Sequence, residues 1–97
     1  MVKHIVFWTL SDAEKSHAQE HAELLRGKFK ALLGVVDGLE AIEVGVNYNG
    51  GEFDLALDCT FTTREAEAAY QKHPGHLAIK KIVHSIVAGR ACVDYEI

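Results

Sequence analysis

Hydrophobic residues follow strand-like patterns in four stretches of this chain and helical patterns between them. The strand-like stretches are rich in β-branched and aromatic residues or alternate hydrophobic with polar positions, as expected where successive side chains point to opposite faces. They lie at Val2–Leu10, Ala41–Tyr48, Phe53–Phe61 and Ile86–Ile97. Hydrophobic residues recur every three or four positions after Ser11 and after Thr62, which predicts amphipathic helices there.

Both faces of the first predicted strand carry large hydrophobic side chains. Alternation separates one row from the other: Val2, His4, Val6 and Trp8 against Lys3, Ile5, Phe7 and Thr9. The later strands have one hydrophobic row each: Ile42, Val44, Val46 and Tyr48, then Phe53, Leu55, Leu57, Cys59 and Phe61. The chain's own helices can cover one face of a sheet, so we expect a second copy of the chain to cover the other, on the side of Phe7.

Two short motifs predict where the helices begin. Ser11–Glu14 and Thr62–Glu65 both have the form of a capping box, in which a hydroxyl and a carboxylate satisfy free N–H groups. The first helix should bury a row of hydrophobic residues and end near Gly34: Ala18, Ala22, Leu25, Phe29 and Leu32.

The helix predicted for Glu65–Lys72 is interrupted at His73–Gly75. Proline disfavours helical geometry in the residue before it, here His73, but suits the first position of a new helix. The chain should therefore bend at Pro74 and continue as a second helix from His76 to Ser85.

The predicted order of elements is β-α-β-β-α-β, with the second helix broken. This order predicts an α+β, ferredoxin-like fold, in which two right-handed crossovers give a four-stranded antiparallel sheet with helices on one face. Residues 1–97 are close to the commonest domain size, so we expect a single domain. An uncovered hydrophobic sheet face would promote aggregation, and a face-to-face homodimer would cover it.

Composition narrows the classes of partner. The formal charge is −4, with 10 Lys and Arg scattered among 14 Asp and Glu, so the chain lacks the basic patch that nucleic acid requires. No hydrophobic run approaches the roughly 18 residues of a membrane span. Cys59 and Cys92 lie in hydrophobic runs without CxxC spacing and without a secretory leader, so we expect buried thiols and a cytoplasmic protein.

Candidate chemistry concentrates around the only proline. An imidazole such as His76 can accept a proton from an activated carbon near neutral pH. The Tyr70 phenol can stabilise the enolate oxygen that forms, and His4, on the first strand, can orient either group. We predict these three as catalytic, with His73 and Trp8 as further substrate-binding candidates, for cyclisation or isomerisation of a small hydrophobic or oxo compound without a cofactor.

Other interpretations of the same residues remain open. Tyr70 can simply pack against the sheet while His73 and His76 cap helix ends, in which case the protein is a non-enzymatic, stress-related or structural dimer. His17 and His21 are one helical turn apart, but no carboxylate or cysteine stands at a recognised zinc spacing from them. We therefore predict no metal site and expect His17, His21 and His84 at the surface.

The chain resembles the stress-responsive dimeric α/β-barrel (Dabb) family over essentially its full length. The resemblance is carried by the opening strand, the broken helix and the closing strand: Val2-Lys3-His4-Ile5-Val6, Tyr70-x-x-His73-Pro74-x-His76 and Val93-Asp94-Tyr95. It implies a homodimer whose two sheets form a barrel with the helices outside. It extends to the plant polyketide cyclase olivetolic acid cyclase, and implies catalytic roles for Tyr70, His76 and His4.

Overall fold

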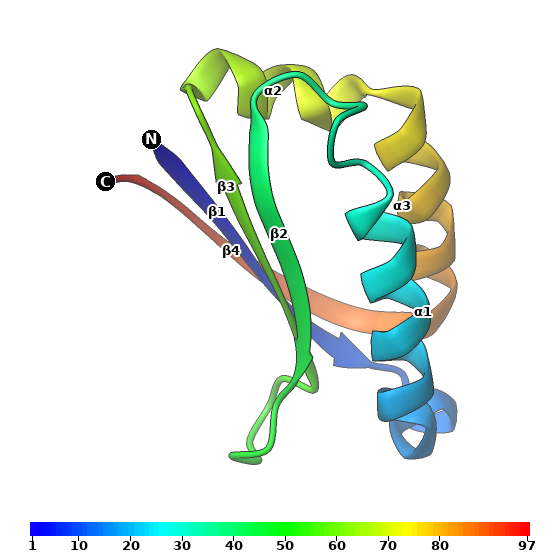
Figure 1. Cartoon of the computed structure of the whole chain (residues 1–97). Coiled ribbons are helices and arrows are strands. Elements are labelled where there is room, and N and C mark those ends of the chain that lie inside the picture. The colour runs from blue at the N-terminus through cyan, green and yellow to red at the C-terminus, as the bar shows by residue number, and fades with distance from the viewer.

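The structure, a computed structural model that describes all residues 1–97, has the predicted order of strands and helices (Figure 1). The strands are β1 (Val2–Leu10), β2 (Leu39–Val46), β3 (Leu55–Phe61) and β4 (Val87–Glu96). The helices are the 3-10 helix η1 (Asp12–His17), α1 (Ala18–Lys30), α2 (Arg64–Lys72) and α3 (Pro74–Ile86). The strands pair antiparallel in the order β2-β3-β1-β4, which confirms the ferredoxin-like fold.

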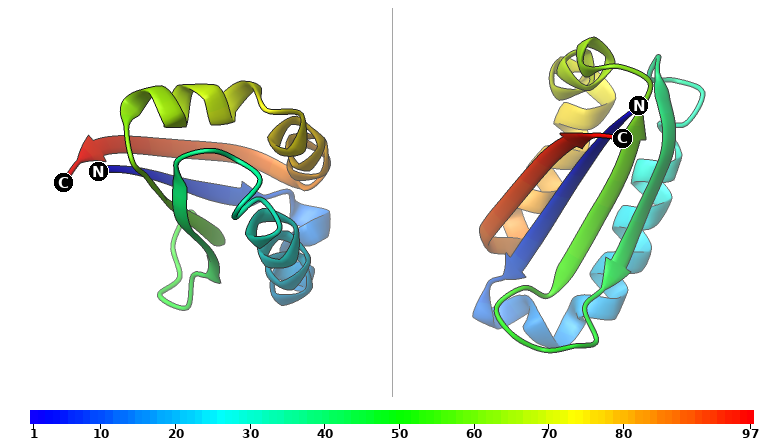
Figure 2. Two further views of the ribbon diagram at one scale, coloured as in Figure 1. Left: turned by 45° about the horizontal axis from the view of Figure 1, so that its top comes forward. Right: turned by 90° about the vertical axis from the view of Figure 1, so that its left-hand side faces the viewer.

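All helices lie on one side of the sheet, so its two faces have different surroundings (Figure 2). The predicted alternation of β1 is confirmed, because its helix-facing row is buried: Val2, His4, Val6 and Trp8. The opposite row contains Phe7, which is 36% exposed. None of the helices is long and hydrophobic enough to cross a membrane.

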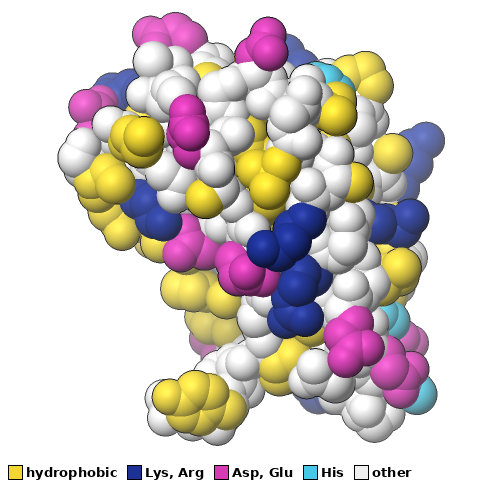
Figure 3. Space-filling model, in the orientation of Figure 1, with side chains coloured by type: hydrophobic (Ala, Val, Ile, Leu, Met, Phe, Trp, Pro, Cys, Tyr) yellow, Lys and Arg dark blue, Asp and Glu magenta, His cyan; other side chains and the backbone are white.

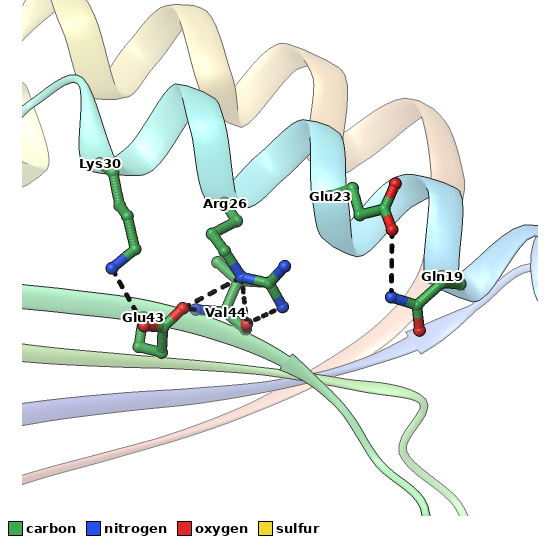
Figure 4. Close-up of polar contacts among 6 residues, drawn as sticks. All are labelled: Gln19, Glu23, Arg26, Lys30, Glu43 and Val44. Atoms are coloured by element: carbon green, nitrogen blue, oxygen red, sulfur yellow. Dashed lines mark hydrogen bonds and ion pairs between the residues drawn. The ribbon is translucent and has the colours of Figure 1, made fainter.

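Charged side chains of α1 fasten this helix to the edge strand β2 (Figure 4). The Arg26 guanidinium donates to the carbonyl of Val44 at 2.8 Å and to the Glu43 carboxylate at 3.1 Å, and the Lys30 ammonium lies 3.0 Å from the same carboxylate. The Val44 N–H donates to Glu43 at 3.1 Å. Both backbone groups of Val44 are therefore occupied by side chains at the open edge of the sheet, which protects this edge from pairing with another chain.

The helix starts differ from the predicted capping boxes. The Ser11 side chain accepts no capping hydrogen bond, and the segment that follows it is the 3-10 helix η1. The Glu14 carboxylate does not reach back to Ser11 but lies 2.8 Å from His21. At the second site the cap is Thr63, whose hydroxyl accepts from the Ala66 N–H at 3.1 Å. The box is incomplete there because the third helical residue is an alanine, which has no side chain to reach back.

Two aromatic residues assigned to hydrophobic strand rows lie elsewhere. Tyr48 is 99% exposed, because β2 ends at Val46 and the chain turns into the loop that precedes β3. Phe53 precedes the first residue of β3 and packs against Phe7 with ring centroids 5.6 Å apart. The prediction that Phe53 joins the core row is therefore wrong, because strand alternation does not extend into this loop.

The break between α2 and α3 is confirmed. His73 ends α2 in an extended conformation, with φ −67° and ψ 133°, and Pro74 occupies the first turn of α3. The change in chain direction at this point is visible in Figure 1, where α2 crosses one end of the sheet and α3 runs along it.

The sheet face away from the helices carries exposed hydrophobic side chains. Phe7, Val93 and Tyr95 are each at least one-third exposed, and strand pairing places Val93 beside Ile5 on this face. Hydrophobic side chains also gather on the left of the space-filling view, on the side of the sheet away from α1 and α3 (Figure 3). This face is the surface on which a second copy would be expected to pack.

A charge placed on this face should disrupt association. We expect Phe7→Glu to shift the protein toward monomer in analytical ultracentrifugation at micromolar concentration, because the carboxylate would have to be buried in the interface. Leu24→Glu is the matched control, since Leu24 is an exposed hydrophobic residue on α1, and it should sediment like the wild type. Monomeric wild type, or equal effects of the two variants, would contradict the placement of the interface.

The two helix starts should respond differently to loss of a hydroxyl. Thr63→Ala removes a capping hydrogen bond and should lower the free energy of unfolding in urea by about 1 kcal/mol. Ser11→Ala should change it by less than about 0.5 kcal/mol, because Ser11 makes no side-chain capping bond. An equal loss in both variants would show that Ser11 also caps a helix in solution.

Candidate active site

A cavity of about 290 Å³ lies between the sheet and the helices. Its walls come from β1, β3, β4 and all three α-helices, and about half of the lining side chains are hydrophobic, among them Val6, Trp8, Phe29, Leu57, Val83 and Val87. His4, Tyr70 and His76 also line it. A cavity that combines a hydrophobic lining with converging polar groups is the usual form of a small-molecule site.

The break at Pro74 places Tyr70 and His76 against each other. Their rings are stacked, with centroids 4.1 Å apart and an angle of 18° between the ring planes. The His4 ring lies 6.1 Å from the Tyr70 ring, in an edge-to-face arrangement. The structure thus brings His4, from the first strand, to the same cavity as Tyr70 and His76 of the broken helix.

Two buried polar atoms at this cavity have no hydrogen-bond partner in the protein. They are the Tyr70 hydroxyl and Nδ1 of His76. Buried polar atoms are nearly always paired, and an unpaired one costs about 1–3 kcal/mol. Both atoms are closed off from solvent, so a bound molecule would reach them only after a small shift of the Tyr70 and His76 rings.

Burial sets the protonation of these groups at neutral pH. Burial raises the pKa of the Tyr70 phenol far above its ordinary value, and the neighbouring Cys59 thiol acts in the same direction. Burial also raises the pKa of Cys59 to about 12. Both groups therefore keep their protons, and the phenol can donate a hydrogen bond to an oxygen on which charge develops.

His76 is held in the neutral form that a general base requires. Burial lowers the pKa of its imidazole, because a cation is poorly solvated inside the protein. The backbone carbonyls of Gln71 and Tyr70 oppose this shift in part, although neither forms a hydrogen bond with Nδ1. Nearby Lys80 adds to the lowering through its positive charge. His76 is therefore predominantly neutral near pH 7 and can accept a proton.

The third ring, that of His4, is held by a carboxylate. Nδ1 of His4 lies 2.5 Å from Oδ1 of Asp94, its direct neighbour in the β1–β4 pairing. A proton on Nδ1 would be shared with this carboxylate, which leaves the other ring nitrogen, Nε2, as the free acceptor in the neutral ring. Sequence reasoning gave Asp94 no chemical role, because no local pattern places it opposite His4. Only the register of the two terminal strands does so.

His4, Asp94 and Cys92 are the residues most capable of holding a metal ion. One potential ligand atom from each lies within 4.8 Å of the others. However, two atoms bound to one tetrahedral zinc ion would be about 3.3 Å apart, so a metal would have to separate His4 from Asp94. His17 and His21 instead face acidic partners, at 3.4 Å from Glu20 and 2.8 Å from Glu14 respectively.

The two predicted substrate-binding residues differ in their positions. Trp8 lines the cavity and stacks on Phe29, with ring centroids 6.2 Å apart. His73 does not line it, and its Nδ1 accepts a hydrogen bond from the Gly75 N–H at 3.0 Å. His73 therefore caps α3, and we leave it out of the site.

The lowered pKa of His76 predicts a loss of stability in acid. The unfolded chain, whose histidines titrate near pH 6.5, takes up a proton that the folded His76 resists, so stability contributed by this group falls as the pH drops below about 6.5. In urea titrations at pH 7.5 and 5.5, wild type should lose more unfolding free energy than His76→Gln. An equal loss would show that burial does not suppress protonation of His76.

Comparison with known proteins agrees with the fold and places the chain in a family. A structure from Bacteroides fragilis, described as a dimeric protein of unknown function with a ferredoxin-like fold, is 35% identical, and the match covers 99% of this chain and 95% of that one with a TM-score of 0.85. A structure from Arabidopsis thaliana is 22% identical over 100% of this chain and 95% of that one, with a TM-score of 0.82.

A hydroxynitrile lyase from Passiflora edulis shares the fold at 17% identity, over 99% of this chain and 92% of that one, with a TM-score of 0.79. No curated protein sequence matches this chain. The model of the stress responsive A/B barrel domain matches residues 2–97, so this chain is a member of the Dabb family.

Proposed function

We propose that this Dabb protein binds a small hydrophobic oxo compound in the cavity and catalyses acid–base chemistry on it without a cofactor. The observation that carries the proposal is the pair of unpartnered buried atoms, the Tyr70 hydroxyl and His76 Nδ1, on one cavity beside the His4–Asp94 pair. A purely structural core would be expected to pair or exclude such atoms. A small shift of the two rings would let a substrate supply the bonds that these atoms lack.

The proposed reaction begins with proton abstraction next to a carbonyl. Neutral His76 takes the proton from carbon, the C–H bond breaks, and the electron pair moves into an enolate whose negative charge rests on oxygen. The Tyr70 phenol, which remains protonated, donates a hydrogen bond to that oxygen. Stabilising the enolate in this way lowers the barrier more than it favours the neutral ketone.

The second half of the reaction needs a proton donor or shuttle, and His4 suits this role. Asp94 would stabilise the positive charge of a protonated His4 and fix the direction of the ring. The enolate can be reprotonated at another carbon, which gives isomerisation. It can also attack a second carbonyl, and the resulting alkoxide then receives the proton that His76 removed, passed on through Nε2 of His4, which gives an aldol-type cyclisation and returns both rings to their neutral state. The proposal therefore covers two reaction classes, isomerisation and cyclisation.

We further propose that the functional unit is a homodimer formed through the exposed face of the sheet. The similar Bacteroides fragilis structure is described as dimeric, and the exposed hydrophobic residues on that face support the same arrangement here. The two free thiols, one of them buried, support a reducing compartment such as the cytoplasm.

Tyr70→Phe and His76→Ala test the catalytic proposal, with turnover of a panel of β-keto and polyketide-like compounds as the measurement. Each change should lower kcat/KM by a factor of about 100 or more. Tyr70→Phe should do so with no loss of folding stability, since it removes a buried hydroxyl that has no partner.

His17→Ala serves as the control, because His17 is exposed on η1, away from the cavity, and it should retain full activity. Turnover by His76→Ala equal to that of wild type would exclude His76 as the base. Saturable ligand binding without turnover of any compound would favour a non-enzymatic binding protein.

A further inference from the structure

The cavity has the opposite charge to the protein as a whole. The chain contains 14 acidic and 10 basic residues, yet no Asp or Glu lines the cavity, whereas Lys80, His84 and Arg90 do. Two acidic groups that contact lining residues are already engaged, since Asp94 faces His4 and Glu67 accepts from Gln71 at 3.1 Å. The entrance is therefore a local positive region on an acidic protein, which favours entry of anions.

Lys80 and Arg90 have no carboxylate partner. Five of the basic side chains form ion pairs in this structure: Lys3, Lys15, Arg26, Lys30 and Arg64. Lys80 and Arg90 form none, although acidic residues outnumber basic ones. Two cations without a carboxylate partner at the mouth of one cavity can form charge-assisted hydrogen bonds with a bound anion.

The positions of these cations relative to the buried groups define an orientation. His76, Lys80 and His84 are spaced four residues apart on α3, and all three line the cavity, so they form one stripe along the helix. Arg90 pairs with Trp8 across β1 and β4 and faces the same cavity from the sheet. Lys80 and Arg90 are exposed, whereas Tyr70 and His76 are buried. A ligand would thus meet cations at the entrance and the neutral acid–base groups inside.

We propose that the ligand of this cavity is an oxo acid, held with its carboxylate between Lys80 and Arg90 and its carbonyl directed toward Tyr70. The inference rests on the proposed function for the identity of the oxo group, but the carboxylate site stands on the charges alone. Successive residues of the α3 stripe are four positions apart, a rise of about 6 Å along the helix, so a carboxylate a few bonds from the carbonyl fits this spacing. The cavity of about 290 Å³ suits a small compound.

Anion binding would also assist the base. The positive charge of Lys80 disfavours protonation of His76, and a carboxylate on Lys80 would offset that charge. Binding of the oxo acid would therefore make His76 more ready to accept the proton, so that recognition and catalysis are coupled through one side chain.

The experiment is a binding titration followed by tryptophan fluorescence. Trp8 is the only tryptophan of the chain and lines the cavity, so its emission reports occupancy directly, without turnover. The probes are 5-oxohexanoate, its uncharged methyl ester and inorganic phosphate. We expect 5-oxohexanoate to bind wild type at least about tenfold more tightly than the ester, the effect of a charge-assisted hydrogen bond or two.

Lys80→Gln and Arg90→Gln should each weaken 5-oxohexanoate binding about three- to tenfold and leave binding of the ester unchanged. Lys81→Gln is the matched control, because Lys81 is an exposed, unpaired lysine next to Lys80 that does not line the cavity, and it should bind like wild type. Circular dichroism melts of the variants verify that each is folded.

Equal affinity for acid and ester, or an equal loss in Lys81→Gln, would overturn the carboxylate site. Phosphate binding as tight as that of the oxo acid would overturn its assignment to a carboxylate. Failure of the acid–base proposal would give a different result: the acid would still bind more tightly than the ester, but neither wild type nor His76→Ala would turn over any compound. Turnover of oxo compounds with no preference for the acid over the ester would contradict the carboxylate site and leave the acid–base proposal intact.

Discussion

The break in the helix at Pro74 is the constraint on which the candidate site depends. Six residues of an uninterrupted helix turn by about 600°, so Tyr70 and His76 would point in directions about 120° apart. The extended conformation of His73 instead restarts the helix in a new direction, and the two rings stack at 4.1 Å. His73 contributes to this geometry as the cap of α3, although it does not reach the cavity.

In that geometry, burial determines the protonation states of Tyr70 and His76. The same desolvation that keeps the proton on Tyr70 keeps it off His76, so a donor and an acceptor stand side by side at neutral pH. The His4–Asp94 pair lies at the other wall, where a carboxylate can compensate charge on the ring. Groups whose environments shift their protonation in complementary ways are typical of acid–base sites.

The two faces of the sheet form two different surfaces. Its helix-facing side, with His4, Val6 and Trp8 of β1, forms the floor of the cavity, while its other side exposes hydrophobic residues such as Phe7 and Val93. Because β-strand residues alternate in direction, a single strand supplies both surfaces. A second copy on the outer face would leave the cavity and its cationic entrance at the helix-facing side of each subunit.

The sequence by itself determined the order of elements, the buried row of β1 and the break at Pro74. These follow from local rules: strand alternation, helical spacing and the restriction that proline places on the residue before it. It also selected Tyr70, His76 and His4 as a group, through their chemistry and the family resemblance. It failed at Phe53, Tyr48 and Ser11, where the chain leaves regular structure or a competing contact forms, and local patterns lose their meaning there.

Only the tertiary structure decided which groups meet. Asp94 stands opposite His4 because of the register between the first and last strands, a pairing across ninety positions of sequence that no local pattern encodes. The unpaired states of the Tyr70 hydroxyl and His76 Nδ1 likewise depend on what surrounds them in space. The cationic entrance combines Lys80 of α3 with Arg90 of β4. It is positive because none of the chain's acidic residues, which outnumber the basic ones, lines the cavity.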